Sequence, residues 1–123
     1  MHLLRFLPAL AWATLIFWLS AQPQLPPPPV VFAGVDKVLH AAVYAVLTLL
    51  TLGGDRWPPL PRAWWWLGVC VLYGLSDEVH QLFVPLRTAD GWDLLADGAG
   101  AALALALVQR WRLAANTRSE VTT

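Results

Sequence analysis

Four long apolar segments, separated by short polar or proline-rich stretches, set the pattern of the chain. Each approaches the roughly 20 residues that an α-helix needs to cross the hydrocarbon core of a bilayer. We therefore predict an all-α membrane protein, a four-transmembrane-helix up-and-down bundle, with helices over residues of about 3–20, 35–52, 63–84 and 92–111. The last three segments carry acids at one end, so the bundle must bury those acids or hold them at the water boundary.

The connections between these segments are short and rich in turn-forming residues. Residues 22–29 (QPQLPPPP) are expected to form an extended polyproline spacer, and residues 53–62 and 85–91 to form turns. The chain has room for a single domain, residues 1–123, in which residues 112–123 form a polar tail.

The first apolar segment has one alternative interpretation, a cleaved signal peptide, because Arg5 precedes it. Signal peptidase sites require small residues, and the large Leu19 in the Leu19-Ser20-Ala21 sequence fits that requirement poorly. We therefore expect the first helix to be retained.

Composition supports the membrane class. Hydrophobic residues make up 58% of the chain and charged residues only 13%, whereas soluble domains carry about 25% charged residues. This excludes intrinsic disorder and a nucleic-acid-binding surface, and the formal net charge of zero predicts no polyanionic partner. The lone cysteine, Cys70, excludes an intrachain disulfide. The lipid bilayer is the expected environment.

The basic residues predict an orientation. In an up-and-down bundle only Lys37 and Arg87 fall on one side, and six arginines fall on the other: Arg5, Arg56, Arg62, Arg110, Arg112 and Arg118. Because basic residues are retained in the cytoplasm, both termini are predicted to be cytoplasmic and the side with Lys37 to face outward.

The same topology gathers polar residues from three segments at the outer side. At about 100° per residue, the polar residues of the second segment share one stripe, and those of the third and fourth share similar arcs. The predicted polar site consists of Asp36, Lys37, His40, Tyr44, Asp77, Glu78, Gln81, Arg87, Asp93 and Asp97. Small residues beside Asp97 permit close helix packing.

Some of these residues have simpler explanations. Asp36 and Asp93 lie near helix N-termini, where an acid complements the helix dipole without any ligand. Asp77 and Glu78 lie near a helix C-terminus, where adjacent acids oppose the dipole, so they indicate a site or an essential ion-pair network. His40 stays open among three roles: a ligand, a proton shuttle and a hydrogen-bonded core histidine.

The ordered set of polar residues resembles the VanZ-like family of small membrane proteins. The matching residues lie between Gly34 and Gly100 and are Asp36, Lys37, His40, Tyr44, Asp77, Glu78, Gln81, Pro85, Arg87 and Asp93. Asp97 departs from the pattern, which has Asn at this position. The resemblance implies a multi-pass protein of the bacterial cytoplasmic (inner) membrane, and the family's namesake is associated with resistance to teicoplanin.

Three functions and a purely structural role remain open at this point. The first is an accessory protein whose outer polar site binds or modulates envelope lipid or cell-wall precursors. The second is an intramembrane enzyme that uses the paired carboxylates, with or without a divalent metal held by His40, Glu78 and Asp93. The third is a carrier, which would require oligomers because four short helices make a poor path. No cofactor is predicted, a divalent cation is an open alternative, and the sequence defines no oligomeric state.

Overall fold

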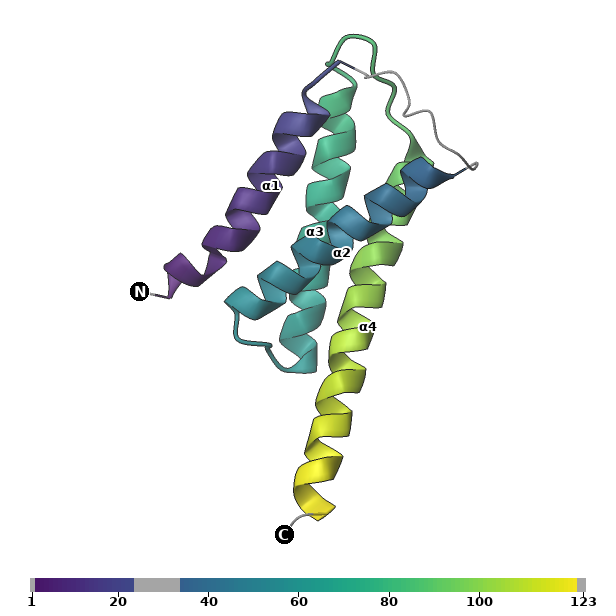
Figure 1. Cartoon of the computed structure of the whole chain (residues 1–123). Helices are drawn as coiled ribbons and strands as arrows, with labels where there is room; N and C mark the ends of the chain where they lie inside the picture. Colours follow the sequence, from purple (N-terminus) through teal and green to yellow (C-terminus); the bar gives the residue numbers. More distant parts are fainter. Residues whose placement is uncertain (1, 24–33, 122–123) are drawn as a thin grey trace.

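The structure, a computed structural model, describes residues 2–23 and 34–121. Helices account for all the regular structure of these ranges: a short 3₁₀ helix, η1 (Leu3–Phe6), and the helices α1 (Leu7–Ser20), α2 (Val35–Gly54), α3 (Leu60–Gln81) and α4 (Gly91–Val121) (Figure 1). The prediction of an all-α chain with four helices is confirmed. Residues 24–29 of the expected polyproline spacer lie outside the described residues.

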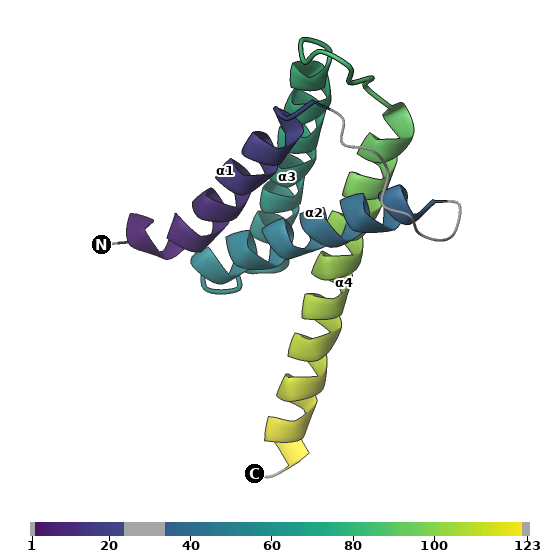
Figure 2. The ribbon, with the colours of Figure 1, turned by 45° about the horizontal axis from the view of Figure 1, so that its top comes forward.

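The helices run alternately up and down (Figures 1 and 2). The C-terminal ends of α1 and α3 and the N-terminal ends of α2 and α4 gather at one end of the bundle, which we call the polar end. α2 and α4 both begin there, and they cross obliquely and in contact before they diverge. This crossing sets the polar residues of the two helices against each other.

Three of the four expected spans are long and apolar enough to cross a membrane: Leu3–Ser20, Val35–Gly54 and Gly91–Arg118. The third expected segment is not among these three, and its helix, α3, carries Arg62, Asp77 and Glu78. α3 contacts all three other helices, so its polar residues can be shielded inside the bundle. The outward faces carry large exposed apolar side chains, as a lipid-facing surface requires.

Two helix boundaries differ from the prediction. α3 lies at residues 60–81 rather than 63–84, since a proline is tolerated in its first turn and the chain leaves the helix in successive i→i−3 turns after Gln81. α4 continues to Val121, through most of the expected polar tail. Residues 112–121 contain neither glycine nor proline, so nothing in the sequence stops the helix.

The crossing of α2 and α4 depends on a single glycine. A Cβ atom added at Gly100 would lie only 1.9 Å from the carbonyl oxygen of Ala41, so the two backbones are in direct contact at this point. Ala101 and Ala104, which follow on α4, are buried. Small residues at such a crossing let the helices approach closely.

The opposite end of the bundle is closed by the turn between α2 and α3. Asp55 accepts two hydrogen bonds from the guanidinium of Arg62 and one from the indole N–H of Trp66 at 2.7 Å. Arg112 of α4 donates to the carbonyl of Pro58 at 2.7 Å. Trp66 therefore packs into this end of the bundle.

This ion pair predicts a pH dependence of stability. The Arg62 guanidinium and the Trp66 N–H lower the pKa of Asp55 below its ordinary value. A lowered folded-state pKa stabilises the fold above the unfolded-state pKa, and this contribution disappears as the pH falls through the folded-state pKa. We expect Asp55→Asn to cost about 1 kcal/mol of unfolding free energy at pH 7, because Arg62 is largely exposed.

The test compares the unfolding of wild type and Asp55→Asn in detergent micelles, followed by circular dichroism between pH 7 and pH 3. The difference between the two proteins should shrink toward zero at the acidic end. A difference that stays constant over this range would contradict the assignment.

Candidate functional site

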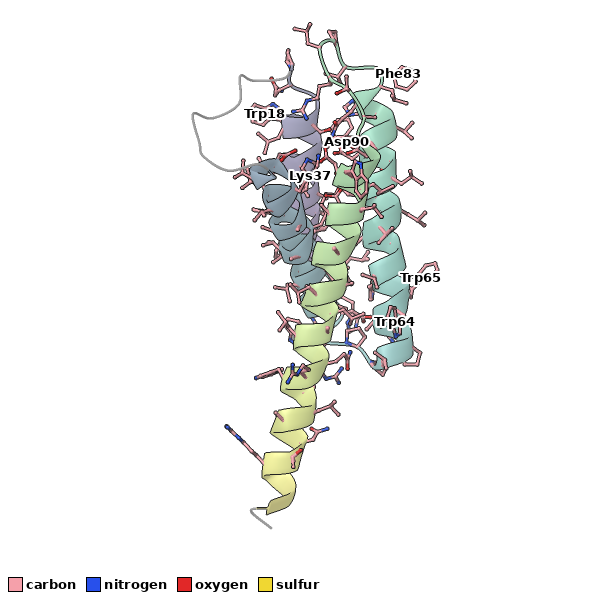
Figure 3. The ribbon with its side chains drawn as sticks, turned by 90° about the vertical axis from the view of Figure 1, so that its right-hand side faces the viewer. Trp18, Lys37, Trp64, Trp65, Phe83 and Asp90 are labelled. Atoms are coloured by element: carbon pink, nitrogen blue, oxygen red, sulfur yellow. The ribbon has the colours of Figure 1, made fainter. Side chains whose placement is uncertain are left out.

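An ion-pair cluster centred on Lys37 occupies the polar end (Figure 3). The Lys37 ammonium lies 2.7 Å from a carboxylate oxygen of Asp90 and 2.9 Å from one of Asp36, and it also donates to Oδ1 of Asp93. Asp90 precedes α4 and accepts a hydrogen bond from the backbone N–H of Trp92, so it also caps the helix start. Lys37 and this N–H hold the pKa of Asp90 below its ordinary value.

Deeper in the bundle, one helix turn beyond Lys37, a histidine joins the cluster. Nδ1 of His40 lies 3.0 Å from Oδ1 of Asp97, and its Nε2 lies 3.6 Å from Oδ2 of Asp93. When the Asp97 carboxylate is ionised it only accepts hydrogen bonds, and Nδ1 of His40 is then the donor toward it. Glu78 approaches from α3, where its Oε2 accepts the backbone N–H of Asp90 at 2.9 Å. Asp97 and Glu78 are both buried.

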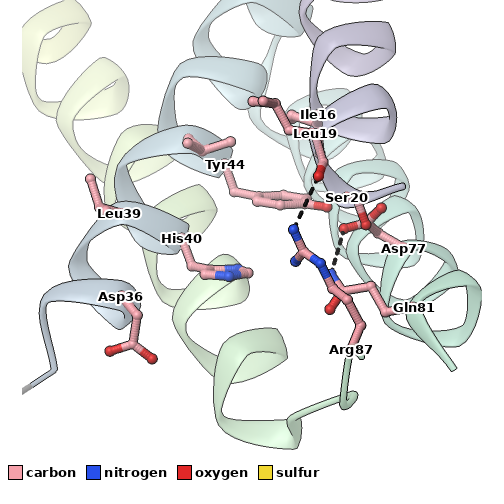
Figure 4. A pocket seen from close by; sticks show the side chains of 11 residues that line it. Ile16, Leu19, Ser20, Asp36, Leu39, His40, Tyr44, Asp77, Gln81 and Arg87 are labelled. Atoms are coloured by element: carbon pink, nitrogen blue, oxygen red, sulfur yellow. Dashed lines mark hydrogen bonds between the residues drawn. The ribbon is translucent and has the colours of Figure 1, made fainter. Parts of the chain in front are cut away.

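A cavity of about 350 Å³ adjoins the cluster between α1, α2, the end of α3 and the following loop (Figure 4). Apolar residues such as Ile16 and Leu39 make up much of its wall. Its polar lining residues are Ser20, Asp36, His40, Tyr44, Asp77, Gln81 and Arg87. The cavity therefore combines an apolar wall with a small set of converging polar groups, as small-molecule sites do.

Arg87 fastens the loop after α3 to the end of α1. Its Nε donates to the carbonyl of Gln22 and its Nη2 to the carbonyl of Leu19, each at 3.0 Å. These two bonds use two of the five N–H donors of the guanidinium. Figure 4 shows the Arg87 side chain between Tyr44 and Gln81. Arg87 therefore brings a permanent positive charge to the wall of the cavity.

The structure distributes the ten predicted site residues over two adjoining groups. Asp36, Lys37, His40, Glu78, Asp93 and Asp97 form the cluster. Asp36, His40, Tyr44, Asp77, Gln81 and Arg87 line the cavity, so two residues belong to both groups. The adjacent acids of α3 separate: Glu78 faces the cluster, whereas Asp77 accepts a hydrogen bond from Gln81 at 3.2 Å beside the cavity.

Two residues of these groups are missing from the predicted set. One is Asp90, although it belongs to an Asp-Gly pair just before a helix, which is a typical capping signal. Ser20 lines the cavity from the end of α1. A single serine that ends an apolar helix carries no periodic signal, so the sequence alone could not have identified it.

A bundle of apolar helices that buries ionisable side chains at one end is a small integral membrane protein with an internal polar site. The chain belongs to the VanZ/LLP1 family, which matches residues 3–112. This confirms the resemblance seen in the polar residues and extends it to the first helix. Comparisons with curated proteins and with solved structures give no match.

Proposed function

We propose that this protein binds, in the cavity between α1, α2 and α3, the phosphate-bearing head group of an envelope lipid or of a lipid-linked cell-wall precursor. The two ligands share their chemistry: an anionic phosphate, neighbouring hydroxyl or amine groups, and an apolar chain. Occupancy of the site would modulate the envelope, with protection against teicoplanin-type glycopeptides as the phenotype to be tested.

The observation that carries the proposal is a set of polar atoms buried beside the cavity. The hydroxyls of Tyr44 and Ser20 and Oδ1 of Asp77 have no hydrogen-bond partner within residues 2–23 and 34–121. All three residues are more than nine-tenths buried. Unsatisfied buried polar groups are costly, and a polar ligand in the cavity would supply partners for them.

The charges around the cavity favour a head group with both a phosphate and donor groups. Arg87 suits phosphate oxygens, whereas Asp36 and Asp77 suit hydroxyls or amines. Lys37 is the other basic residue of this end. Because three carboxylates already surround the Lys37 ammonium, we assign phosphate binding to Arg87.

The orientation belongs to the same proposal. The six arginines of the other side lie on η1, α4, the start of α3 and the turn before it, away from the polar end. By the positive-inside rule the end that carries these arginines is cytoplasmic, together with both termini. The cavity then faces the outer leaflet of the bacterial cytoplasmic membrane, where envelope lipids and late cell-wall precursors are accessible.

Two tyrosines provide a matched test of the binding site. Tyr44→Phe removes an unpartnered buried hydroxyl, so we expect unchanged or higher stability and head-group affinity reduced about fivefold, the equivalent of one hydrogen bond. Tyr73→Phe removes a hydroxyl that donates to the Ala13 carbonyl at 2.6 Å, so we expect lower stability and unchanged affinity.

The affinity measurement is a tryptophan-fluorescence titration in detergent with short-chain phosphatidylethanolamine, phosphatidylglycerol and an undecaprenyl phosphate analogue as probes. The three probes distinguish a membrane phospholipid from a precursor carrier. Equal affinities of wild type and Tyr44→Phe for every probe would refute the site.

Growth assays address the phenotype. A susceptible bacterial host expressing wild type, Tyr44→Phe or Tyr73→Phe at matched membrane levels is challenged with teicoplanin and vancomycin. Protection by wild type and Tyr73→Phe, reduced for Tyr44→Phe, would link the cavity to envelope chemistry. Equal growth of all strains and of the empty host would remove the resistance part of the proposal.

The alternative, an intramembrane enzyme with Asp77 and Glu78 as acid and base, is less favoured by the geometry. Glu78 accepts a hydrogen bond from the backbone N–H of Asp90, whereas Asp77 accepts one from the side chain of Gln81. The two carboxylates therefore face different parts of the molecule. An acid–base pair must reach one reacting group from both sides. We therefore favour binding as the function of the cavity.

A further inference from the structure

We infer that His40, Glu78 and Asp93 form a divalent-cation site between α2, α3 and α4. One potential ligand atom of each residue lies within 4.8 Å of the others, close enough for one ion to contact all three. The three residues come from three different helices, so an ion here would join the elements of the polar end. This inference concerns the cluster, and it does not depend on head-group binding in the cavity.

The other polar atoms of these side chains are already engaged, which leaves one atom of each for the ion. Asp97 holds Nδ1 of His40, Lys37 contacts Oδ1 of Asp93, and the backbone N–H of Asp90 donates to Oε2 of Glu78. The remaining atoms are Nε2 of His40 and Oδ2 of Asp93, which lie 3.6 Å apart, and the unpartnered Oε1 of Glu78. Such outer partners orient metal ligands and fix the histidine tautomer.

Glu78 provides the independent sign that a ligand belongs here. Its side chain is more than nine-tenths buried, and its Oε1 has no hydrogen-bond partner in the described part of the chain. A carboxylate oxygen held away from water without a partner is strongly unfavourable. A cation coordinated by this oxygen would remove that cost.

The charge of the cluster points the same way. Five carboxylates, from Asp36, Glu78, Asp90, Asp93 and Asp97, face a single ammonium, so the group is formally −4 when His40 is neutral. An excess of negative charge in a partly buried region favours a bound cation. Lys37 is shared with Asp36 and Asp90, so it neutralises only part of the charge of Asp93.

The donor set selects the kind of ion. One imidazole nitrogen and two carboxylate oxygens suit Zn²⁺ or Mn²⁺ better than Ca²⁺, which prefers oxygen ligands alone. Asp97 stands where the family pattern has Asn, and it gives this chain a carboxylate on the ligand histidine. A carboxylate partner raises the basicity of a coordinated imidazole. Asp97→Asn should therefore weaken metal affinity about tenfold while retaining the site.

The test uses the full chain, purified in detergent without a polyhistidine tag and stripped of metal with a chelator. Titration with Zn²⁺ and with Mn²⁺, followed by calorimetry and elemental analysis, should give one bound ion per chain. His40→Ala and Asp93→Asn should lose this binding. His80→Ala is the matched control that should retain it, because His80 lies outside the cluster and stacks on Phe17.

A second measurement does not require a ligand variant to fold. In a chain with His2 and His80 replaced by alanine, His40 is the only histidine left. Pulsed electron paramagnetic resonance of the Mn²⁺-loaded protein should then show coupling to one imidazole nitrogen. Absence of a stoichiometric ion in wild type, absence of this coupling, or equal affinity in folded His40→Ala would each overturn the inference.

Discussion

Replacing Gly100 with alanine is expected to cost about 3 kcal/mol or more of unfolding free energy and to deplete the folded protein from the membrane. The added methyl group would lie 1.9 Å from the Ala41 carbonyl oxygen, far inside van der Waals contact. The obstructing atom belongs to backbone, which cannot rotate away as a side chain can. α2 and α4 would have to separate, and overpacking of this kind is destabilising.

The separation would also damage the polar end. Lys37 and His40 lie one helix turn or less before Ala41 on α2, and their partners Asp93 and Asp97 precede Gly100 on α4. Moving the crossing point apart would lengthen each of these contacts. We therefore expect Gly100→Ala to lose metal and head-group binding together with stability.

Gly98 supplies the control, two residues away on the same helix. A Cβ atom there meets nothing within 4 Å among the described residues, so Gly98→Ala should be neutral or stabilising by up to about 1 kcal/mol. Stability is measured by unfolding in mixed micelles, and membrane levels by quantitative blotting. Similar behaviour of the two alanine variants would show that α2 and α4 are not in backbone contact.

Replacing Lys37 with methionine is expected to produce the second large loss, about 3 kcal/mol. Methionine keeps much of the apolar stem but removes the ammonium that contacts three carboxylates. Asp93 is the most buried of the three and would be left facing like charges. Removing one partner of a buried or partly buried ion pair leaves the charge of the other partner uncompensated, and this strongly lowers stability.

Two further variants separate this cause from a simple loss of packing. Asp36→Asn removes an exposed carboxylate of the same cluster and should leave the stability nearly unchanged. Asp93→Asn added to Lys37→Met removes the stranded charge and should recover part of the loss. If the double variant is as unstable as the sum of the single changes, the three-carboxylate arrangement is not the cause.

The helices were predictable because their signal is redundant. Each apolar run extends over several turns, so a few polar residues do not hide it. The gathering of polar residues at one end followed from topology alone, since chain reversal brings every second helix end to the same depth. The start of α2 was predictable for a similar reason. Gly34 precedes the helix with a left-handed φ of 91°, a backbone conformation that glycine adopts readily.

The pairing inside the site could not be predicted in the same way. Asp77 and Glu78 are neighbours in sequence and share an arc of the helix, yet one faces a cavity and the other faces His40. Which way each points depends on where α1 and α4 pack against α3, and that is set by long-range contacts. The close approach at Gly100 is equally a tertiary property, because Gly98 carries the same residue type and meets no neighbour.

The length of α4 has a mechanical consequence. Its 31 residues span about 46 Å, whereas the hydrocarbon core of a bilayer is about 30 Å thick. Its last turns extend past the turn between α2 and α3 and end away from the other helices (Figure 1). A reporter protein fused after this helix would therefore be held away from the bundle by the helix itself. The polar end, on the other side of the bundle, would stay accessible to a ligand.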